Sequence, residues 1–166
     1  MNALVLSHAH YDHTGGLQAF MKYSQPALPL YAHPDIFRPR FSIKEGKTRS
    51  IGMPLTREEL SKHFNLHLDA EAVEVLPHLW TTGEITPRKE FLGSSPTCFI
   101  QGEDGWQPDP YRDDMALVLE AQSGLILVCG CCHAGILNTL AHVRGVVNRA
   151  LPAVIGGAHL AYVEES

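Results

Sequence analysis

The sequence lacks an excess of positive charge and lacks long apolar runs. Its 166 residues include 13 Lys and Arg against 18 Asp and Glu, which gives a formal net charge of −5. A nucleic-acid partner is therefore not expected, because its binding relies on basic surface. No stretch approaches the roughly 18 apolar residues of a membrane span, and the first residues lack the basic and apolar regions of a signal peptide. We expect a cytoplasmic protein without a membrane partner.

Cysteine is scarce and poorly spaced for disulfide bonds. Of the four cysteines, Cys129, Cys131 and Cys132 are bunched together and Cys98 lies far away. This spacing favours reduced thiols, either buried or close to a metal, over a disulfide framework. The chain length and a hydrophobic content of 45% fit one globular domain, which we assign to residues 1–166.

Histidine is plentiful, with ten in the chain, and several follow apolar segments. The same order of apolar strand, tight turn and histidine occurs in "ALVLSHAHYDH", "LILVCGCCH" and "PAVIGGAH". Strands that end at one edge of a sheet bring their last side chains together, and sites in α/β proteins form at such edges. The pattern predicts that distant residues converge, namely His8, His10, Asp12, His13, His133 and His159.

These side chains suit a pair of metal ions. Neutral imidazole is a good zinc ligand, and two histidines one residue apart can face one cation from an extended loop. Asp12 and His13 are adjacent, so we expect them to point in different directions and to serve a second cation. Two neighbouring metals can share a hydroxide and lower its pKa toward neutrality. Gly15 and Gly16 would allow close backbone approach, and a helix beginning behind them would favour a substrate phosphate.

The predicted elements alternate strands with helices. "TREELSKHF" contains a capping box formed by Thr56 and Glu59, and "MALVLEAQSGLILVCG" predicts a hairpin over 115–130. Residues 86–112 contain four prolines, three glycines and few periodic apolar positions, so we predict a long loop there. The remaining strands are expected near 3–7 and 29–34 and in "AVEVLP", "LWTTGEI" and "LPAVIGGAHL", with strand and loop over 41–55. Helices are expected near 15–23, with Thr14 as N-cap, and near 133–147.

The string "HAHYDHTGG" matches the His-x-His-x-Asp-His signature of the metallo-β-lactamase fold. "LWTTGEI", "DDMALVLEAQSGLILVCGCCHAGILNTL" and "AVIGGAHL" resemble the subgroup of 7,8-dihydropterin-6-methyl-4-(β-D-ribofuranosyl)aminobenzene-5′-phosphate synthase-like proteins. The resemblance implies an α/β fold of αββα sandwich type. Relatives have strands before the signature and a segment after the last histidine, so we expect this chain to be an incomplete unit, lacking N-terminal strands and a C-terminal segment.

The resemblance also implies a division of ligands between two metals. His8 and His10 would hold one metal with a later histidine, and Asp12 and His13, also our candidate catalytic residues, would hold the other. Among later ligands we rank His133 and His159 ahead of Cys131, which occupies the place of a bridging acid in the superfamily. Zinc is the default cofactor for both sites, and manganese or iron would also fit a mixed set of ligands.

The leading hypothesis is a metal-dependent hydrolase or transferase that acts on a phosphate-bearing small molecule, with dihydropterin-type synthase chemistry implied by the resemblance. The alternative is a metal-binding fragment or subunit that is inactive without a complementing chain or a second copy, so whether the isolated chain is an enzyme stays open. Redox chemistry of the flavin-linked di-iron kind is disfavoured, because those relatives prefer a carboxylate where His10 stands.

Several polar residues have either a functional or a structural interpretation. His33 precedes Pro34 at a strand end and is a candidate for the pocket lining. Asp113 and Asp114 are candidates for orienting a metal-bound histidine, or they only begin the hairpin. Glu84 is a pocket acid or a turn residue. We treat the remaining histidines as lacking partners and function: His63, His67, His78 and His142.

Overall fold

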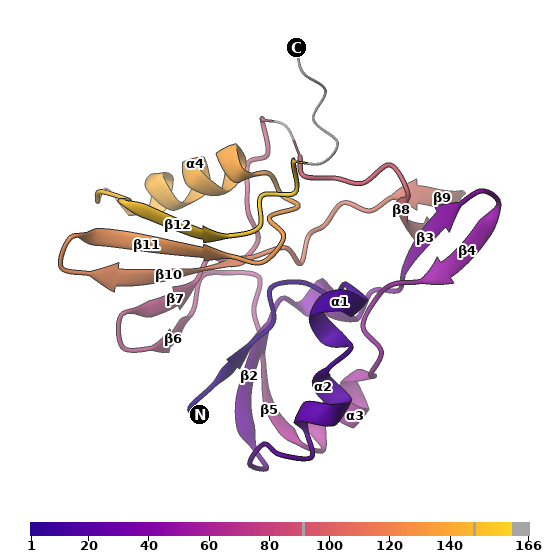
Figure 1. Ribbon diagram of the computed structural model, residues 1–166, viewed down its shortest axis with the longest axis horizontal. Helices are drawn as coiled ribbons and strands as arrows, with labels where there is room; N and C mark the ends of the chain where they lie inside the picture. Colours follow the sequence, from indigo (N-terminus) through magenta and orange to yellow (C-terminus); the bar gives the residue numbers. More distant parts are fainter. Residues whose placement is uncertain (91, 148, 161–166) are drawn as a thin grey trace.

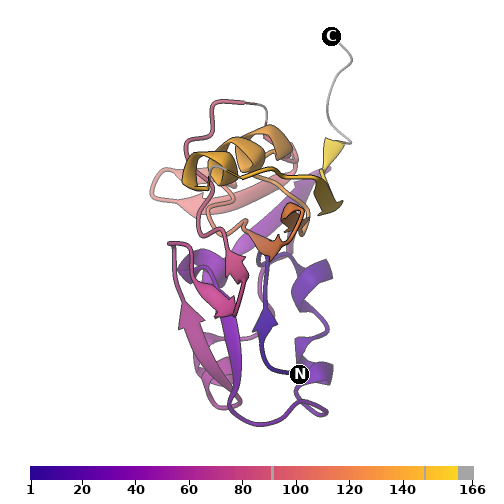
Figure 2. The same ribbon diagram turned by 90° about the vertical axis from the view of Figure 1, so that its left-hand side faces the viewer.

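The computed structural model describes residues 1–90, 92–147 and 149–160. Two sheets occupy different ends of the molecule, each with helices against it, and a third sheet projects to one side (Figure 1). Turned by 90°, the longest helix lies at one end and the amino-terminal sheet at the other (Figure 2). This is the layered α/β arrangement that the resemblance implies.

The three-stranded sheet is parallel throughout, in the order β1-β2-β5. Alternate residues of β2 are buried, as expected for a strand with one face on a core. Leu30 and Phe64 of the sheet share this core with Leu17 and Leu60 from two short helices. The predicted capping box is confirmed at the start of α3. The elements are β1 (Leu4–Val5), β2 (Leu28–Ala32), α2 (Leu17–Phe20), α3 (Arg57–Ser61) and β5 (Phe64–Leu68).

The five-stranded sheet has the order β12-β11-β10-β7-β6. Its centre is the predicted antiparallel hairpin, and the edge strand β12 runs parallel to β11. The predicted helix after the hairpin packs Val143 against Leu125 and Leu127. The elements are β6 (Glu74–Leu76), β7 (Leu79–Thr81), β10 (Ala116–Ala121), β11 (Gly124–Cys129), α4 (Ile136–Val146) and β12 (Ala153–Gly156).

The four-stranded sheet, hereafter the arm, corrects one prediction. We predicted a loop over 86–112, but this segment contains an antiparallel hairpin that adds to a second hairpin in the order β4-β3-β8-β9. The prolines misled us because they flank or end the strands and do not interrupt them. The elements are η1 (Pro34–Phe37, a 3₁₀ turn), β3 (Arg40–Lys44), β4 (Lys47–Ser50), β8 (Cys98–Gly102) and β9 (Gly105–Pro108).

The prediction of one helix over 15–23 behind Thr14 was also wrong. Thr14 is the last residue of α1 (Tyr11–Thr14), and its hydroxyl donates to the carbonyls of Ala9 and His10. Gly15 separates α1 from α2, and a Cβ there would lie 2.7 Å from the Tyr11 carbonyl oxygen. Both helices have only four residues. The Gly-Gly pair therefore serves a tight turn and offers no long helix N-terminus for a phosphate.

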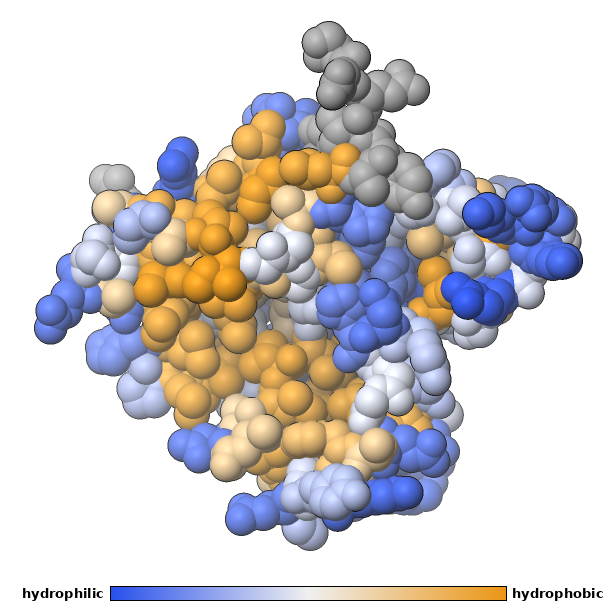
Figure 3. Space-filling view, in the orientation of Figure 1, coloured by the Kyte–Doolittle hydropathy of each residue, from blue (hydrophilic) through white to orange (hydrophobic). Residues whose placement is uncertain are grey.

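The surface differs between the arm and the five-stranded sheet. The arm is mostly hydrophilic, whereas apolar surface gathers over the side formed by α4 and β12 (Figure 3). At the edge strand, Val154 and Ile155 are 45% and 57% exposed. Among the described residues, no helix is long and apolar enough to cross a membrane.

Candidate metal centre

The histidine loop (residues 7–10) follows β1 and touches the five-stranded sheet. Met115, just before β10, donates its N–H to the Ser7 carbonyl oxygen (3.0 Å). Gly130, just after β11, lies so near that a Cβ there would approach the Ser7 hydroxyl to 2.3 Å. The side chains of His8 and His10 are buried, with ring centroids 4.8 Å apart. Close packing of the two strand ends thus encloses both imidazoles.

His133 comes from the loop between β11 and α4 (residues 130–135). Its ring centroid lies 4.9 Å from that of His8 and 4.7 Å from that of His10. Nδ1 lies 2.7 Å from the Gly93 carbonyl oxygen. Because a carbonyl only accepts, this contact places the proton of the neutral ring on Nδ1 and leaves a lone pair on Nε2. Tyr111 stacks on the same ring at 4.4 Å. His133 is therefore fixed in orientation and tautomer.

His159 follows β12 and reaches the same place. Its ring centroid lies 4.3 Å from that of His133, and its backbone adopts a left-handed φ of 44°. The three strand–turn–histidine segments of the sequence therefore meet in space, with His8, His10, His133 and His159 linked by ring contacts below 5 Å.

Asp12 and His13 lie on α1 at the exposed side of the imidazoles. Our expectation that they point apart was wrong, because Asp12 Oδ2 lies 3.5 Å from His13 Nε2. Cys131 Sγ lies 3.0 Å from the same nitrogen. Potential ligand atoms fall into two groups, each within 4.8 Å: His8, Cys131 and His133 form one, and Asp12, His13 and Cys131 form the other. Cys131, which we ranked below His133 and His159, is thus common to both groups.

Burial determines the charge state of the imidazoles of His8, His10 and His133. Desolvation, reinforced by neighbouring positive groups, lowers the pKa of His10 to about 4. Desolvation is also the main reason why the pKa of His133 is lowered to about 3. The pKa of His8 is lowered too, mainly by burial. All three rings are neutral at pH 7. Their Nε2 atoms are buried and have no hydrogen-bond partner within the described part of the chain. Such buried, unsatisfied nitrogens need a partner that the protein itself does not supply.

Arg40 supports the histidine loop from the arm. Its buried guanidinium donates to Asp109 (2.9 Å) and to Asp113 (2.6 Å), and Asp113 accepts the backbone N–H of Ala9 at 2.8 Å through its other oxygen. Asp109 also lies 4.0 Å from His10. Our sequence reasoning missed Arg40, Asp109 and Tyr111. Only the burial of Arg40, which a sequence does not display, would have distinguished it from other arginines.

Asp114 supports the second loop. Its carboxylate accepts the backbone N–H of Ala134 at 2.8 Å, next to His133. Burial raises the pKa of Asp114 to about 6 and that of Asp113 to about 7. Each carboxylate therefore holds the backbone beside a histidine. The role that we considered for these two residues, orienting a metal-bound histidine, stays a prediction.

Comparison with known proteins agrees with this geometry. Residues 2–86, just over half of the chain, match the family model of the metallo-beta-lactamase superfamily. The chain belongs to this superfamily. A structure described as that of Tm1679, a metal-dependent hydrolase of the beta-lactamase superfamily, superposes with a TM-score of 0.81 over 99% of this chain and 59% of that one, at 21% identity. This similarity confirms the metallo-β-lactamase-type fold.

Two relatives come from Methanocaldococcus jannaschii. The chain is 30% identical, over 96% of its length, to 7,8-dihydropterin-6-methyl-4-(β-D-ribofuranosyl)-aminobenzene-5′-phosphate synthase, of which it covers 56%. It is 28% identical, over 98% of its length, to an uncharacterized protein, of which it covers 59%. The chain thus spans less than two thirds of these relatives, and their names apply to the longer proteins.

The donor set fits the metal that a member of the metallo-β-lactamase superfamily is expected to bind. Three neutral imidazoles present unsatisfied Nε2 atoms, and a thiol and a carboxylate complete two adjacent groups. Nitrogen and sulfur donors favour zinc, and the carboxylate also admits manganese or iron. Burial raises the pKa of the Cys131 thiol to about 11, and a bound cation would oppose this effect by stabilising the thiolate.

His33 and Glu84 do not belong to the two groups of potential metal ligands. The His33 ring accepts the backbone N–H of Asp35 at the start of η1 (3.0 Å) and approaches Glu84 at 3.7 Å. Glu84 accepts two hydrogen bonds from Arg112, which lower the pKa of its carboxyl. Both side chains therefore have structural partners, and His33 does not line the cavity beside His10 that is described below.

The four histidines that we treated as unpartnered do have contacts. His63 Nε2 lies 2.8 Å from the Ser24 hydroxyl, and His67 stacks on Tyr31 at 4.6 Å. His78 lies 3.5 Å from Glu120, and His142 lies 2.7 Å from the Thr86 carbonyl oxygen. These contacts give each a structural explanation.

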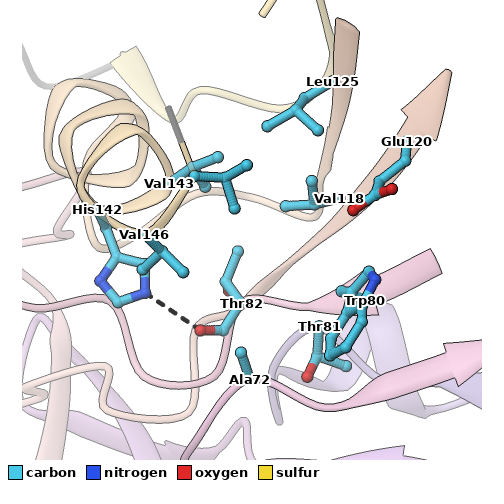
Figure 4. Close-up of a pocket in the computed structure, with 11 residues that line it drawn as sticks. Ala72, Trp80, Thr81, Thr82, Val118, Glu120, Leu125, His142, Val143 and Val146 are labelled. Atoms are coloured by element: carbon cyan, nitrogen blue, oxygen red, sulfur yellow. Dashed lines mark hydrogen bonds between the residues drawn. The ribbon is translucent and has the colours of Figure 1, made fainter. Parts of the chain in front are cut away.

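An apolar hollow lies between α4 and the five-stranded sheet (Figure 4), and none of the described residues that line it belongs to the metal centre. Its volume is about 260 Å³, and valine and leucine side chains form much of its wall. His142 at its rim lies 3.2 Å from the Thr82 carbonyl oxygen. The hollow is mainly apolar, and we do not treat it as a candidate active site.

Proposed function

We propose that this chain carries the metal centre of a metal-dependent enzyme that acts on a phosphate-bearing small molecule. One observation supports the metal above all others: the rings of His8, His10 and His133 lie within 5 Å of one another, centroid to centroid, and the buried Nε2 of each has no protein partner among the described residues. His8, His133 and Cys131 would hold one cation, with His10 and His159 beside them. Asp12 and His13 would hold a second cation with Cys131.

Bound metal would supply Lewis acidity and lower the pKa of a coordinated water toward neutrality. The protein contributes orientation. Gly93 fixes the tautomer of His133, and the Arg40–Asp113 pair fixes the backbone between His8 and His10. The Asp12 side chain is 75% exposed and faces a cavity. Asp12, with His13 beside it, would therefore hold the second cation at the side of the centre that faces this cavity.

The phosphate in the substrate is supported by the relative whose name ends in 5′-phosphate synthase. Synthase chemistry on a dihydropterin is the specific version of this proposal, and hydrolysis of a phosphate ester is the general version.

The test combines metal content with turnover. Purified chain should retain at least one equivalent of zinc, manganese or iron and should hydrolyse bis(4-nitrophenyl) phosphate, and His8→Ala should lose both properties. His67→Ala is the control, because it removes an imidazole that stacks on Tyr31. Less than about half an equivalent of metal after growth with added metal would contradict the proposal.

A second candidate is a metal-binding subunit that needs another polypeptide for activity. The observation that favours it is the edge strand β12, which pairs with β11 alone among the described strands and exposes the apolar side chains of Val154 and Ile155. Metal binding without turnover in the isolated chain would favour this candidate. Turnover that His8→Ala abolishes would exclude it.

A further inference from the structure

A cavity of about 640 Å³ lies between the arm and α1, within the size range of ligand pockets. One wall comes from the metal centre, with His10 and Asp12, and the opposite wall comes from the arm. The two walls are joined by a hydrogen bond from the Tyr11 N–H to the Ile51 carbonyl oxygen (2.7 Å). The other residues that line the cavity are Tyr11, Ser42, Arg49, Ser50, Ile51, Thr97 and Cys98.

The strand register explains which arm residues face this cavity. Ser42 of β3 pairs with Arg49 of β4 on one side and with Cys98 of β8 on the other. Residues directly opposite each other in neighbouring strands point to the same face of a sheet. Arg49, Ser42 and Cys98 therefore form one row across three strands, and all three line the cavity.

Among the described residues that line this cavity, Arg49 is the only Lys or Arg. Within the described residues no ion pair involves Arg49, whereas Arg40, Arg112 and Arg149 each pair with a carboxylate. The hydroxyl of Ser42, on the same face as Arg49, adds a hydrogen-bond donor to this wall. A planar guanidinium beside a hydroxyl donor matches the geometry of a phosphate group.

We propose that Arg49 binds the phosphate monoester end of the substrate, while the rest of the molecule extends across the cavity to His10 and Asp12. This inference rests on the proposed function and specifies its substrate. The substrate would be a small molecule whose phosphate contributes to binding and lies apart from the reacting group. The arm, whose strands β8 and β9 we first predicted as a loop, is thereby the element that selects the substrate.

The experiment measures binding of ribose 5-phosphate, with ribose as its uncharged counterpart, by calorimetry. Wild-type chain is compared with Arg49→Ala, Arg49→Lys and Lys47→Ala. Lys47 is the matched control, because it lies two residues away on the same strand, is exposed and does not line the cavity. Each protein is tested after treatment with EDTA and again after loading with zinc, so that binding to the arm and binding to the metal are separated.

We expect metal-free wild-type chain to bind ribose 5-phosphate in preference to ribose. Arg49→Ala should weaken this binding on the order of tenfold to a hundredfold, as for the loss of a charge-assisted hydrogen bond. Arg49→Lys should recover part of the loss, and Lys47→Ala should change the affinity less than about twofold, as expected for a screened surface charge.

Two results would overturn the inference. One is equal affinity in Arg49→Ala and Lys47→Ala. The other is binding of ribose 5-phosphate that requires zinc and does not depend on Arg49, because the phosphate would then sit on the metal. A failure of the proposed function has a different signature: the chain would bind no metal, while the comparison of metal-free variants would still decide the role of Arg49.

Discussion

Replacing Arg40 by methionine tests whether the arm holds the metal centre in place. The guanidinium contacts Asp109 at 2.9 Å and Asp113 at 2.6 Å, and all three side chains are at most 1% exposed. Removing one partner of a buried ion pair costs about 3–5 kcal/mol, because the remaining charge stays in a dry environment. We expect Arg40→Met to lower the free energy of unfolding by this amount at pH 8.

The loss should depend on pH. Burial already raises the pKa of Asp113 to about 7 with Arg40 present, and loss of the guanidinium should raise it further. The unfolded value for an aspartate is about 3.9, so between this pH and the higher folded-state pKa of Asp113 the folded variant binds more protons than the unfolded chain. The stability of the variant should therefore fall as the pH rises from about 4 through 7, and the deficit against wild-type should shrink at acidic pH.

Urea denaturation gives the free energy of unfolding, and zinc titration gives a second measurement. Because Asp113 also holds the Ala9 N–H, zinc affinity in Arg40→Met should fall by about tenfold or more, as is typical when support for metal ligands is lost. The control is Arg112→Met, which removes a partly exposed pair with Glu84 and should cost less than about 1 kcal/mol. Equal losses in the two variants, or unchanged zinc affinity in Arg40→Met, would refute the reasoning.

Three further predictions concern other parts of the chain. Because burial lowers the pKa values of His8, His10 and His133, the metal-free protein should lose stability as the pH falls from about 6.5 toward 4. The free energy of unfolding should decrease by up to about 1.4 kcal/mol per pH unit for each titrating ring. A stability independent of pH in this window would contradict this prediction. Thr56→Ala should cost about 1 kcal/mol of unfolding free energy through loss of the capping box, and a change below about 0.3 kcal/mol would argue against that role. Cys131→Ser should remove the sulfur scattering shell from the X-ray absorption spectrum of the zinc-loaded chain, and a sulfur shell that persists in the variant would exclude this thiol as a ligand.

Sequence reasoning could identify the convergence of histidines because it depends on local rules. An apolar strand followed by a turn and a histidine fixes where the side chain emerges, and strands of one sheet share an edge. The segments ending at His133 and His159 obey this rule, and their rings lie 4.3 Å apart. The hairpin over 115–130 and the capping box at Thr56 were equally accessible, since their signals lie within a few residues.

The supporting residues could not be found in this way. Arg40 pairs with carboxylates 69 and 73 positions away, and nothing in its neighbourhood marks it as buried. The same applies to the arm: β8 follows a proline-rich stretch but pairs with β3, which lies more than 50 positions earlier. Contacts of this kind are decided by packing between distant segments and leave no periodic signal in the sequence.

The central claim is that two loops, residues 7–10 and 130–135, jointly hold a metal through His8, His133 and Cys131, with His10 beside them, and zinc stoichiometry tests it most directly. Wild-type chain, His133→Ala and the control His142→Ala are stripped with EDTA, reloaded with zinc and analysed by elemental analysis after dialysis. The account predicts at least one zinc per chain in wild-type and His142→Ala, and a clear loss in His133→Ala. Equal zinc content in all three proteins, or none in wild-type, would contradict it.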